Sequence, residues 1–118
     1  MVEAWNTQAF REKLRETGQT VVVDFYTDWC PSCRTLSVLL EQIAREWEGK
    51  PVCFGKVNGE EEPALAREYE IRSVPTVIVL RDGVPVARSV GAIGKSKLNG
   101  MILAGTEEAS RSGDPVLP

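Results

Sequence analysis

Histidine is absent from the 118 residues of the chain, and cysteine occurs only three times. Without histidine, the chain lacks the commonest metal ligand and the commonest general base near neutral pH. Any proton transfer must therefore use carboxylates, lysine, cysteine or water. Three cysteines are too few for a disulfide scaffold, and a chain of this length can bury a core without one. The length fits a single domain.

Strong charge and long apolar runs are also missing from the sequence. The net charge of −3 provides no basic face of the kind on which nucleic-acid-binding proteins depend. No apolar run approaches the length of a membrane span. The first ten residues, MVEAWNTQAF, lack the basic segment and the apolar stretch of a signal peptide. We therefore expect a cytoplasmic protein that binds neither nucleic acid nor membranes.

Segments with helical spacing of apolar residues alternate with short β-branched and aromatic runs. The run TVVVDFYT (20–27) is nearly continuous, as in a central strand that is covered on both faces. It is followed by Leu36, Leu40 and Ile43 at helical spacing, and then by an apolar run over 50–58, which together predict a right-handed βαβ unit. The predicted elements are a helix over 7–17, a strand over 20–27, a helix over 31–48, a strand over 50–58, a short helix over 63–69, strands over 75–80 and 84–90, and a helix over 95–103.

Caps and turn residues delimit several of these elements. Asn6 is a predicted N-cap for the first helix. Asp82-Gly83 predicts a tight hairpin turn between the last two strands, and Pro85 puts the second of them at a sheet edge. Residues 106–118 have little apolar surface to bury and are expected to be disordered. This leaves one α/β domain over residues 1–105.

Cys30 and Cys33 lie three residues apart, directly after the buried strand over 20–27. A structural zinc site is disfavoured because it needs four ligands, and the chain offers one cysteine pair, a distant third cysteine and no histidine. A purely structural disulfide is also disfavoured, because so short a loop gains little entropy from closure. In the first turn of a helix, residues three apart lie on one face about 5–6 Å from each other, within disulfide range. A redox-active pair fits this spacing better.

The position of the proline suggests which cysteine is the nucleophile. Pro31 favours the first position of a helix and pushes Cys30 into the extended conformation of an N-cap. The Cys30 sulfur would then face the free N–H groups of Ser32 and Cys33, which stabilise a thiolate. We therefore expect Cys30 to attack and Cys33 to resolve the mixed disulfide.

Several separated motifs, VVVDFYTDWCPSC, GKVN, YEIRSVPT and RDGVPVARSVGA, resemble the thioredoxin family over about residues 3–104. The resemblance implies the thioredoxin fold, an α/β domain with a central mixed five-stranded sheet flanked by four helices. It also implies dithiol–disulfide exchange with protein substrates, no bound cofactor, a flavoprotein disulfide reductase as electron donor, and a monomer. The expected function is a cytoplasmic protein disulfide reductase. The alternatives are a disulfide oxidant or isomerase of less reducing potential, and a binding module without redox turnover.

The resemblance assigns Asp24 as a buried acid beneath the cysteines and Lys56 as a lysine near it. Burial in an apolar strand should raise the pKa of Asp24, which could then take the proton from Cys33, through water. The alternative for Asp24 is a capped or paired strand carboxylate, and that for Lys56 is a solvated lysine at a strand end.

The resemblance also implies a substrate-binding surface around Cys30. Pro75 would be cis and face the cysteines, although the sequence alone favours a trans proline that begins an edge strand. The backbone of Val74 would pair with an extended substrate segment. The expected substrate-binding residues are Trp29, Pro31, Ser32, Val74, Pro75, Gly91 and Ala92.

The chain departs from the family pattern at several positions. Pro31-Ser32 stands between the cysteines where the family usually has glycine and then proline, so the proline is placed as in glutaredoxins. Val38 replaces a mid-helix proline, and Gly94 replaces the serine that usually caps the last helix. Cys53 is an additional thiol, interpreted either as a small buried hydrophobic residue or as a regulatory site.

Overall fold

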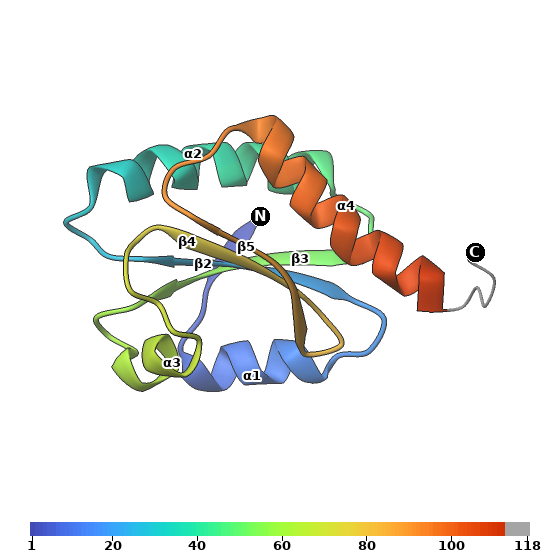
Figure 1. Cartoon of the computed structure of the whole chain (residues 1–118), viewed down its shortest axis with the longest axis horizontal. Coiled ribbons are helices and arrows are strands. Elements are labelled where there is room, and N and C mark those ends of the chain that lie inside the picture. The colour runs from blue at the N-terminus through green and yellow to red at the C-terminus, as the bar shows by residue number, and fades with distance from the viewer. Residues whose placement is uncertain (113–118) are drawn as a thin grey trace.

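The computed structural model describes the backbone of residues 1–112 and the side chains of residues 1–106. The elements are, in order, β1 (Val2–Ala4), α1 (Thr7–Arg15), β2 (Thr20–Tyr26), α2 (Pro31–Glu46), β3 (Val52–Asn58), α3 (Pro63–Glu68), β4 (Thr76–Arg81), β5 (Val84–Val90) and α4 (Lys95–Ser112). The strands form one sheet in the order β1-β3-β2-β4-β5. Helices α2 and α4 cover one face of this sheet, and α1 and α3 cover the other (Figure 1). The predicted mixed five-stranded sheet with four helices is thereby confirmed.

Strand β2 occupies the centre of the sheet, where both of its faces are covered. It runs parallel to β3 and antiparallel to β4. Because side chains alternate along a strand, β2 contributes to two cores. Val22 packs in the cluster that includes Leu36, Leu40 and Ile43 of α2, whereas Phe25 packs in the cluster that includes Phe10 of α1. Two positions after Val22, Asp24 lies on the face of the sheet that α2 covers.

Helix α1 begins where its cap was predicted. The Asn6 side chain accepts a hydrogen bond from the backbone N–H of Ala9 at 2.8 Å. The chain enters α1 through Trp5, whose ring packs directly on the backbone of β3. An added Cβ at Gly55 would lie only 2.3 Å from this ring, so a side chain at that position would displace the tryptophan.

The β4–β5 hairpin closes through the predicted Asp-Gly turn. Asp82 and Gly83 both have positive φ, of 51° and 79°, which is the conformation of the two-residue turn that matches strand twist. Strand β5 is an edge strand, as the proline at position 85 predicted.

The structure differs from the sequence prediction at both ends of the chain. The strand pattern over 1–10 is too weak to predict β1, which spans three residues and pairs with β3. Helix α4 continues to Ser112, so the expected helix end at Leu103 is wrong, and residues 106–112 are helical rather than disordered. Gly105 allows close packing here, because an added Cβ would lie 2.8 Å from side chains of β2 and β4. The remaining part of the expected tail, residues 113–118, lies outside the described residues. Neither α4 nor any other helix of the described chain is long and apolar enough to cross a membrane.

Candidate active site

Cys30 is the N-cap of α2, as predicted, and Pro31 is the first helical residue. The Cys30 backbone is extended, with φ −94° and ψ 110°. Its sulfur accepts a hydrogen bond from the backbone N–H of Cys33 at 3.2 Å, and the Ser32 hydroxyl lies 3.4 Å away. Ser32 thus approaches the sulfur mainly through its side chain, whereas the sequence had suggested its backbone N–H. Pro31 and Ser32 are both exposed.

The two cysteines differ in how readily they ionise. Hydrogen bonds from the Cys33 thiol and then the Ser32 hydroxyl lower the pKa of Cys30, and they outweigh desolvation although Cys30 is only 4% exposed. Burial raises the pKa of Cys33 to about 12, and the hydrogen bond to Cys30 raises it further. Cys30 is therefore the cysteine of this pair that ionises more readily, and the Cys33 thiol holds its proton more firmly.

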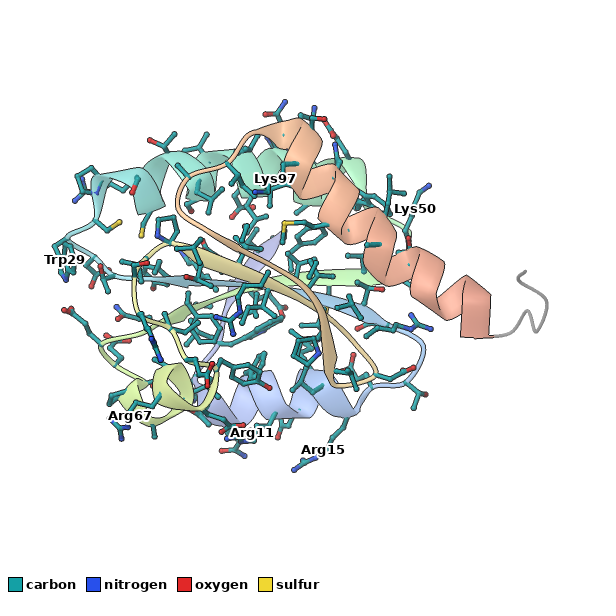
Figure 2. The ribbon with its side chains drawn as sticks, viewed as in Figure 1. Arg11, Arg15, Trp29, Lys50, Arg67 and Lys97 are labelled. Atoms are coloured by element: carbon teal, nitrogen blue, oxygen red, sulfur yellow. The ribbon has the colours of Figure 1, made fainter. Side chains whose placement is uncertain are left out.

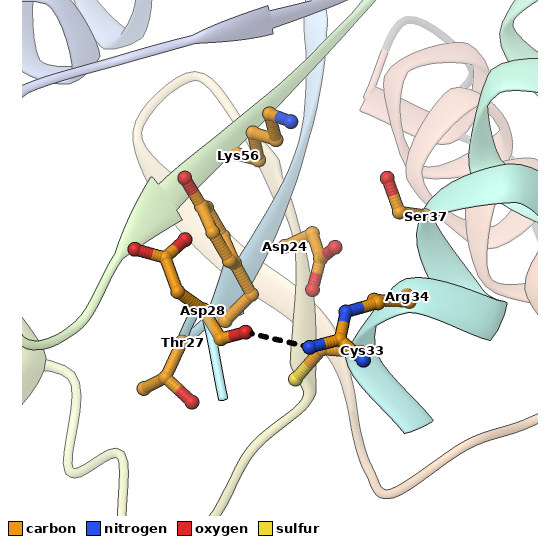
Figure 3. Close-up of a pocket in the computed structure, with 8 residues that line it drawn as sticks. Asp24, Thr27, Asp28, Cys33, Arg34, Ser37 and Lys56 are labelled. Atoms are coloured by element: carbon orange, nitrogen blue, oxygen red, sulfur yellow. Dashed lines mark hydrogen bonds between the residues drawn. The ribbon is translucent and has the colours of Figure 1, made fainter. Parts of the chain in front are cut away.

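Asp24 lies in a cavity of about 250 Å³ that also reaches Cys33. Asp24 is 1% exposed, and burial raises its pKa to about 7, although the charge of Lys56 lowers it in part. Figure 3 shows Asp24 between Lys56 and the first turn of α2. A carboxyl group with this pKa can accept a proton near neutral pH, and the cavity has room for water between it and Cys33.

Lys56 lies opposite Asp24 in the β2–β3 register, which explains its effect on the acid. It is half-buried, and its ammonium group lies 5.3 Å from the centre of the Tyr26 ring. Lys56 is therefore only partly exposed to solvent.

The loop before β4 reaches the cysteines from the other side. The Val74–Pro75 peptide bond is cis, and the Val74 carbonyl lies 3.8 Å from Cys30 Sγ. Gly91, whose φ is +92°, donates its N–H to the Pro75 carbonyl at 2.8 Å, so the end of β5 lies beside this loop. Ala92 follows and is exposed.

Trp29 presents a large apolar surface next to Cys30. It is 63% exposed, and its indole N–H donates to Glu60 Oε2 at 2.8 Å (Figure 2 shows Trp29 at the rim of the molecule). Trp29, Arg72 and Val74 are among the residues that line a groove of about 410 Å³ beside the cysteines. An exposed aromatic side chain held by a hydrogen bond is well suited to contact a partner.

Cys53 lies apart from these groups, on β3. It is half-buried and packs against the core beneath α1, in agreement with its interpretation as a small hydrophobic residue. Burial raises the pKa of its thiol to about 11, so it is a poor nucleophile near neutral pH. In the part of the chain that the structure describes, no three cysteine or carboxylate side chains gather closely enough to hold a metal ion.

A family model described as Thioredoxin matches residues 1–104. The chain belongs to the thioredoxin family. Thioredoxin from Chlorobaculum thiosulfatiphilum is 36% identical over 89 residues, which cover 75% of this chain and 82% of that protein. Thioredoxin 1 from Nostoc sp. is 37% identical over 90 residues, 76% of this chain and 83% of the relative. The crystal structure of a thioredoxin from Malassezia sympodialis matches with a TM-score of 0.79 at 29% identity and covers 90% of this chain and 91% of that one. Thioredoxins are thiol–disulfide oxidoreductases, and this chain is a protein disulfide reductase.

Three site residues were not foreseen from the sequence. Glu60 was assigned no role from the sequence, yet its side chain accepts a hydrogen bond from the Trp29 indole. Arg34 and Ser37 line the Asp24 cavity from α2. The spacing of Ser37 from Cys33 was a usable signal, because residues four apart share a helix face. The position of Asp24 beneath that face is a property of the tertiary fold.

Proposed function

We propose that this member of the thioredoxin family reduces protein disulfides through Cys30 as nucleophile and Cys33 as resolving thiol. The Cys30 thiolate attacks a substrate disulfide, and a mixed disulfide forms with loss of one substrate thiolate. Cys33 then attacks Cys30, the second substrate thiolate leaves, and the protein is left with a Cys30–Cys33 disulfide. The observation that carries the assignment is the lowered pKa of Cys30 at the helix N-terminus beside the raised pKa of Cys33.

In this proposal, Asp24 accepts the proton of Cys33 during the second step, and Lys56 adjusts the ionisation of Asp24. Support comes from the cavity that Asp24 and Cys33 share and from the pKa of about 7 that burial gives the acid. A base must be at least partly ionised at the working pH, and a pKa near 7 meets this condition.

The substrate-binding surface of this proposal comprises the residues around the Cys30 sulfur. An extended substrate segment would pair with the Val74 backbone and contact the Trp29 ring. The short distance from Cys30 Sγ to the Val74 carbonyl, 3.8 Å, supports this arrangement. The other residues of the proposed substrate-binding surface are Pro31, Ser32, Pro75, Gly91 and Ala92.

We propose that the domain over residues 1–105 works as a monomer in the cytoplasm. A flavoprotein disulfide reductase would return the Cys30–Cys33 disulfide to the dithiol, and no bound cofactor is required.

Reduction of insulin disulfides with a dithiol as electron donor tests the proposed activity. The wild-type protein should accelerate the reaction, and a Cys30→Ser variant should not. An inactive wild-type protein would indicate a binding module. A glutathione redox titration then separates a reductase from an oxidant, because it measures the reduction potential. The contact of the Ser32 hydroxyl with the Cys30 sulfur favours the reduced form, so it makes this potential less negative.

A further inference from the structure

The cavity beneath the cysteines contains a buried carboxylate oxygen that is not hydrogen-bonded to protein. Within residues 1–112, Asp24 Oδ1 has no hydrogen-bond partner. A buried polar atom without a partner is costly, and a charged one more so. The cavity of about 250 Å³ is large enough for several water molecules, and water needs further polar groups to hold it in place.

Ser37 supplies a polar group on the opposite wall of this cavity. It follows Cys33 by four residues, so both lie on one face of α2. Ser37 is half-buried and lines the same cavity as Asp24 and Cys33. Figure 3 shows it on α2, on the side of the cavity away from β3. Arg34 also lines the cavity, but its guanidinium group donates to the Asp28 carbonyl at 3.1 Å and the residue is exposed.

We propose that Ser37 is a positioning residue for proton transfer, and that its hydroxyl and the Asp24 carboxylate together hold the water that accepts the Cys33 proton. The proposal rests on the proposed role of Asp24 as the final acceptor. It adds a residue that touches neither the substrate nor the reacting sulfur atoms.

The step that Ser37 assists is the resolution of the mixed disulfide. The Cys33 thiol gives its proton to the bound water, which passes a proton to the Asp24 carboxylate. The Cys33 sulfur forms a bond to the Cys30 sulfur, and the bond between Cys30 and the substrate breaks. The substrate sulfur leaves with the bonding electron pair as a thiolate. The two electrons that reduce the substrate disulfide come from the two cysteines.

The other groups that face Asp24 define the electrostatic setting of this water. Lys56 is the register partner of Asp24 on β3, and the uncharged Val77 is its register partner on β4. The titratable and charged groups that line the cavity with Asp24 are Tyr26, Asp28, Cys33, Arg34 and Lys56. The Ser37 hydroxyl can donate a hydrogen bond toward the carboxylate, directly or through the water. Such a donor favours the ionised acid, so its removal should move the ionisation of Asp24 to higher pH.

Stopped-flow mixing of the reduced protein with a chromogenic aromatic disulfide separates the two steps. Attack by Cys30 releases the first coloured thiol, and resolution by Cys33 releases the second. In Ser37→Ala, the pH inflection of the second phase should rise by roughly half a unit to one unit, and the rate below the inflection should fall about three- to tenfold. The first phase should not change. Ser37→Thr retains a hydroxyl and should restore the wild-type profile. Thr35→Ala removes an exposed hydroxyl from the same helix outside the cavity and should have no effect.

Asp24→Asn distinguishes failure of this inference from failure of the proposed function. If Asp24→Asn slows the second phase but Ser37→Ala has the wild-type inflection, the role of Ser37 is refuted and that of Asp24 stands. If Asp24→Asn resolves as fast as the wild type at every pH, both roles are refuted. An equal shift in Ser37→Ala and Thr35→Ala would also refute the role of Ser37, because it would indicate a general effect on α2.

Discussion

Replacing Asp24 with Asn should stabilise the folded protein at alkaline pH, because it removes a buried charge. Asp24 is 1% exposed, and burial raises its pKa from 3.8 to about 7. The difference is about three pH units, and each unit corresponds to about 1.4 kcal/mol. Ionisation of this one group therefore costs the fold roughly 4 kcal/mol above pH 7, relative to the unfolded chain.

The sign of the pH dependence follows from which state holds the proton. The unfolded chain loses the Asp24 proton near pH 4, and the folded protein keeps it to about pH 7. Between these values the folded state binds more protons, so the contribution of Asp24 to stability falls as pH rises. Asn has no such slope, but its buried amide needs hydrogen-bond partners and costs about 1–3 kcal/mol if they are missing. The variant should be more stable than the wild type by roughly 1–3 kcal/mol at pH 8 and no more stable at pH 5.

Urea unfolding of both proteins between pH 5 and 8, with all thiols kept reduced, measures this difference. The reduced state is required because a Cys30–Cys33 disulfide would add its own contribution. A stability difference that stays constant across this pH range would refute the reasoning, because it would mean that Asp24 ionises alike in the folded and unfolded states.

Three further changes test other parts of the structure. Brief iodoacetamide treatment near neutral pH should alkylate Cys30 far faster than the other two cysteines, and mass mapping that finds another cysteine modified first would contradict the assignment. Ser32→Ala removes a hydroxyl 3.4 Å from the Cys30 sulfur, so the reduction potential should become more negative; an equal or less negative potential in a glutathione titration would count against the contact. Gly55→Ala puts a Cβ 2.3 Å from the Trp5 ring and should lower the free energy of unfolding by about 1–3 kcal/mol. In the control Gly100→Ala, an added Cβ meets no described atom within 4 Å, so urea unfolding should show a free energy of unfolding that is higher by up to about 1 kcal/mol. A Gly55→Ala variant as stable as the wild type would mean that the Trp5 ring can move aside.

Most of the fold could be predicted because its signals are local. The apolar run of β2 and the helical spacing in α2 each follow from a few consecutive residues. Strand β1 could not be predicted in this way, because its three residues form a strand only through their pairing with β3. The end of α4 was placed too early because the helix continues past its last large apolar residue, and helix propensity alone gave too weak a signal there.

In the site, too, local features could be predicted and contacts between distant residues could not. The N-cap position of Cys30 follows from the proline beside it, so the sequence was enough to predict where this cysteine lies on α2. The contact between Trp29 and Glu60 joins residues 31 positions apart, and nothing in either local sequence indicates it. Ser37 faces Asp24 only because β2 passes beneath α2. Groups that meet across elements in this way require the tertiary structure.

Trapping of the substrate intermediate tests the assignment of nucleophile and resolving thiol most directly. A Cys33→Ser variant, mixed in reduced form with a disulfide-bonded protein such as insulin, should accumulate one mixed disulfide, and peptide mass mapping without reductant should locate it at Cys30. A Cys30→Ser variant should trap no substrate and should have no reductase activity. Accumulation of the substrate at Cys53, or turnover by the Cys30→Ser variant, would contradict the assignment.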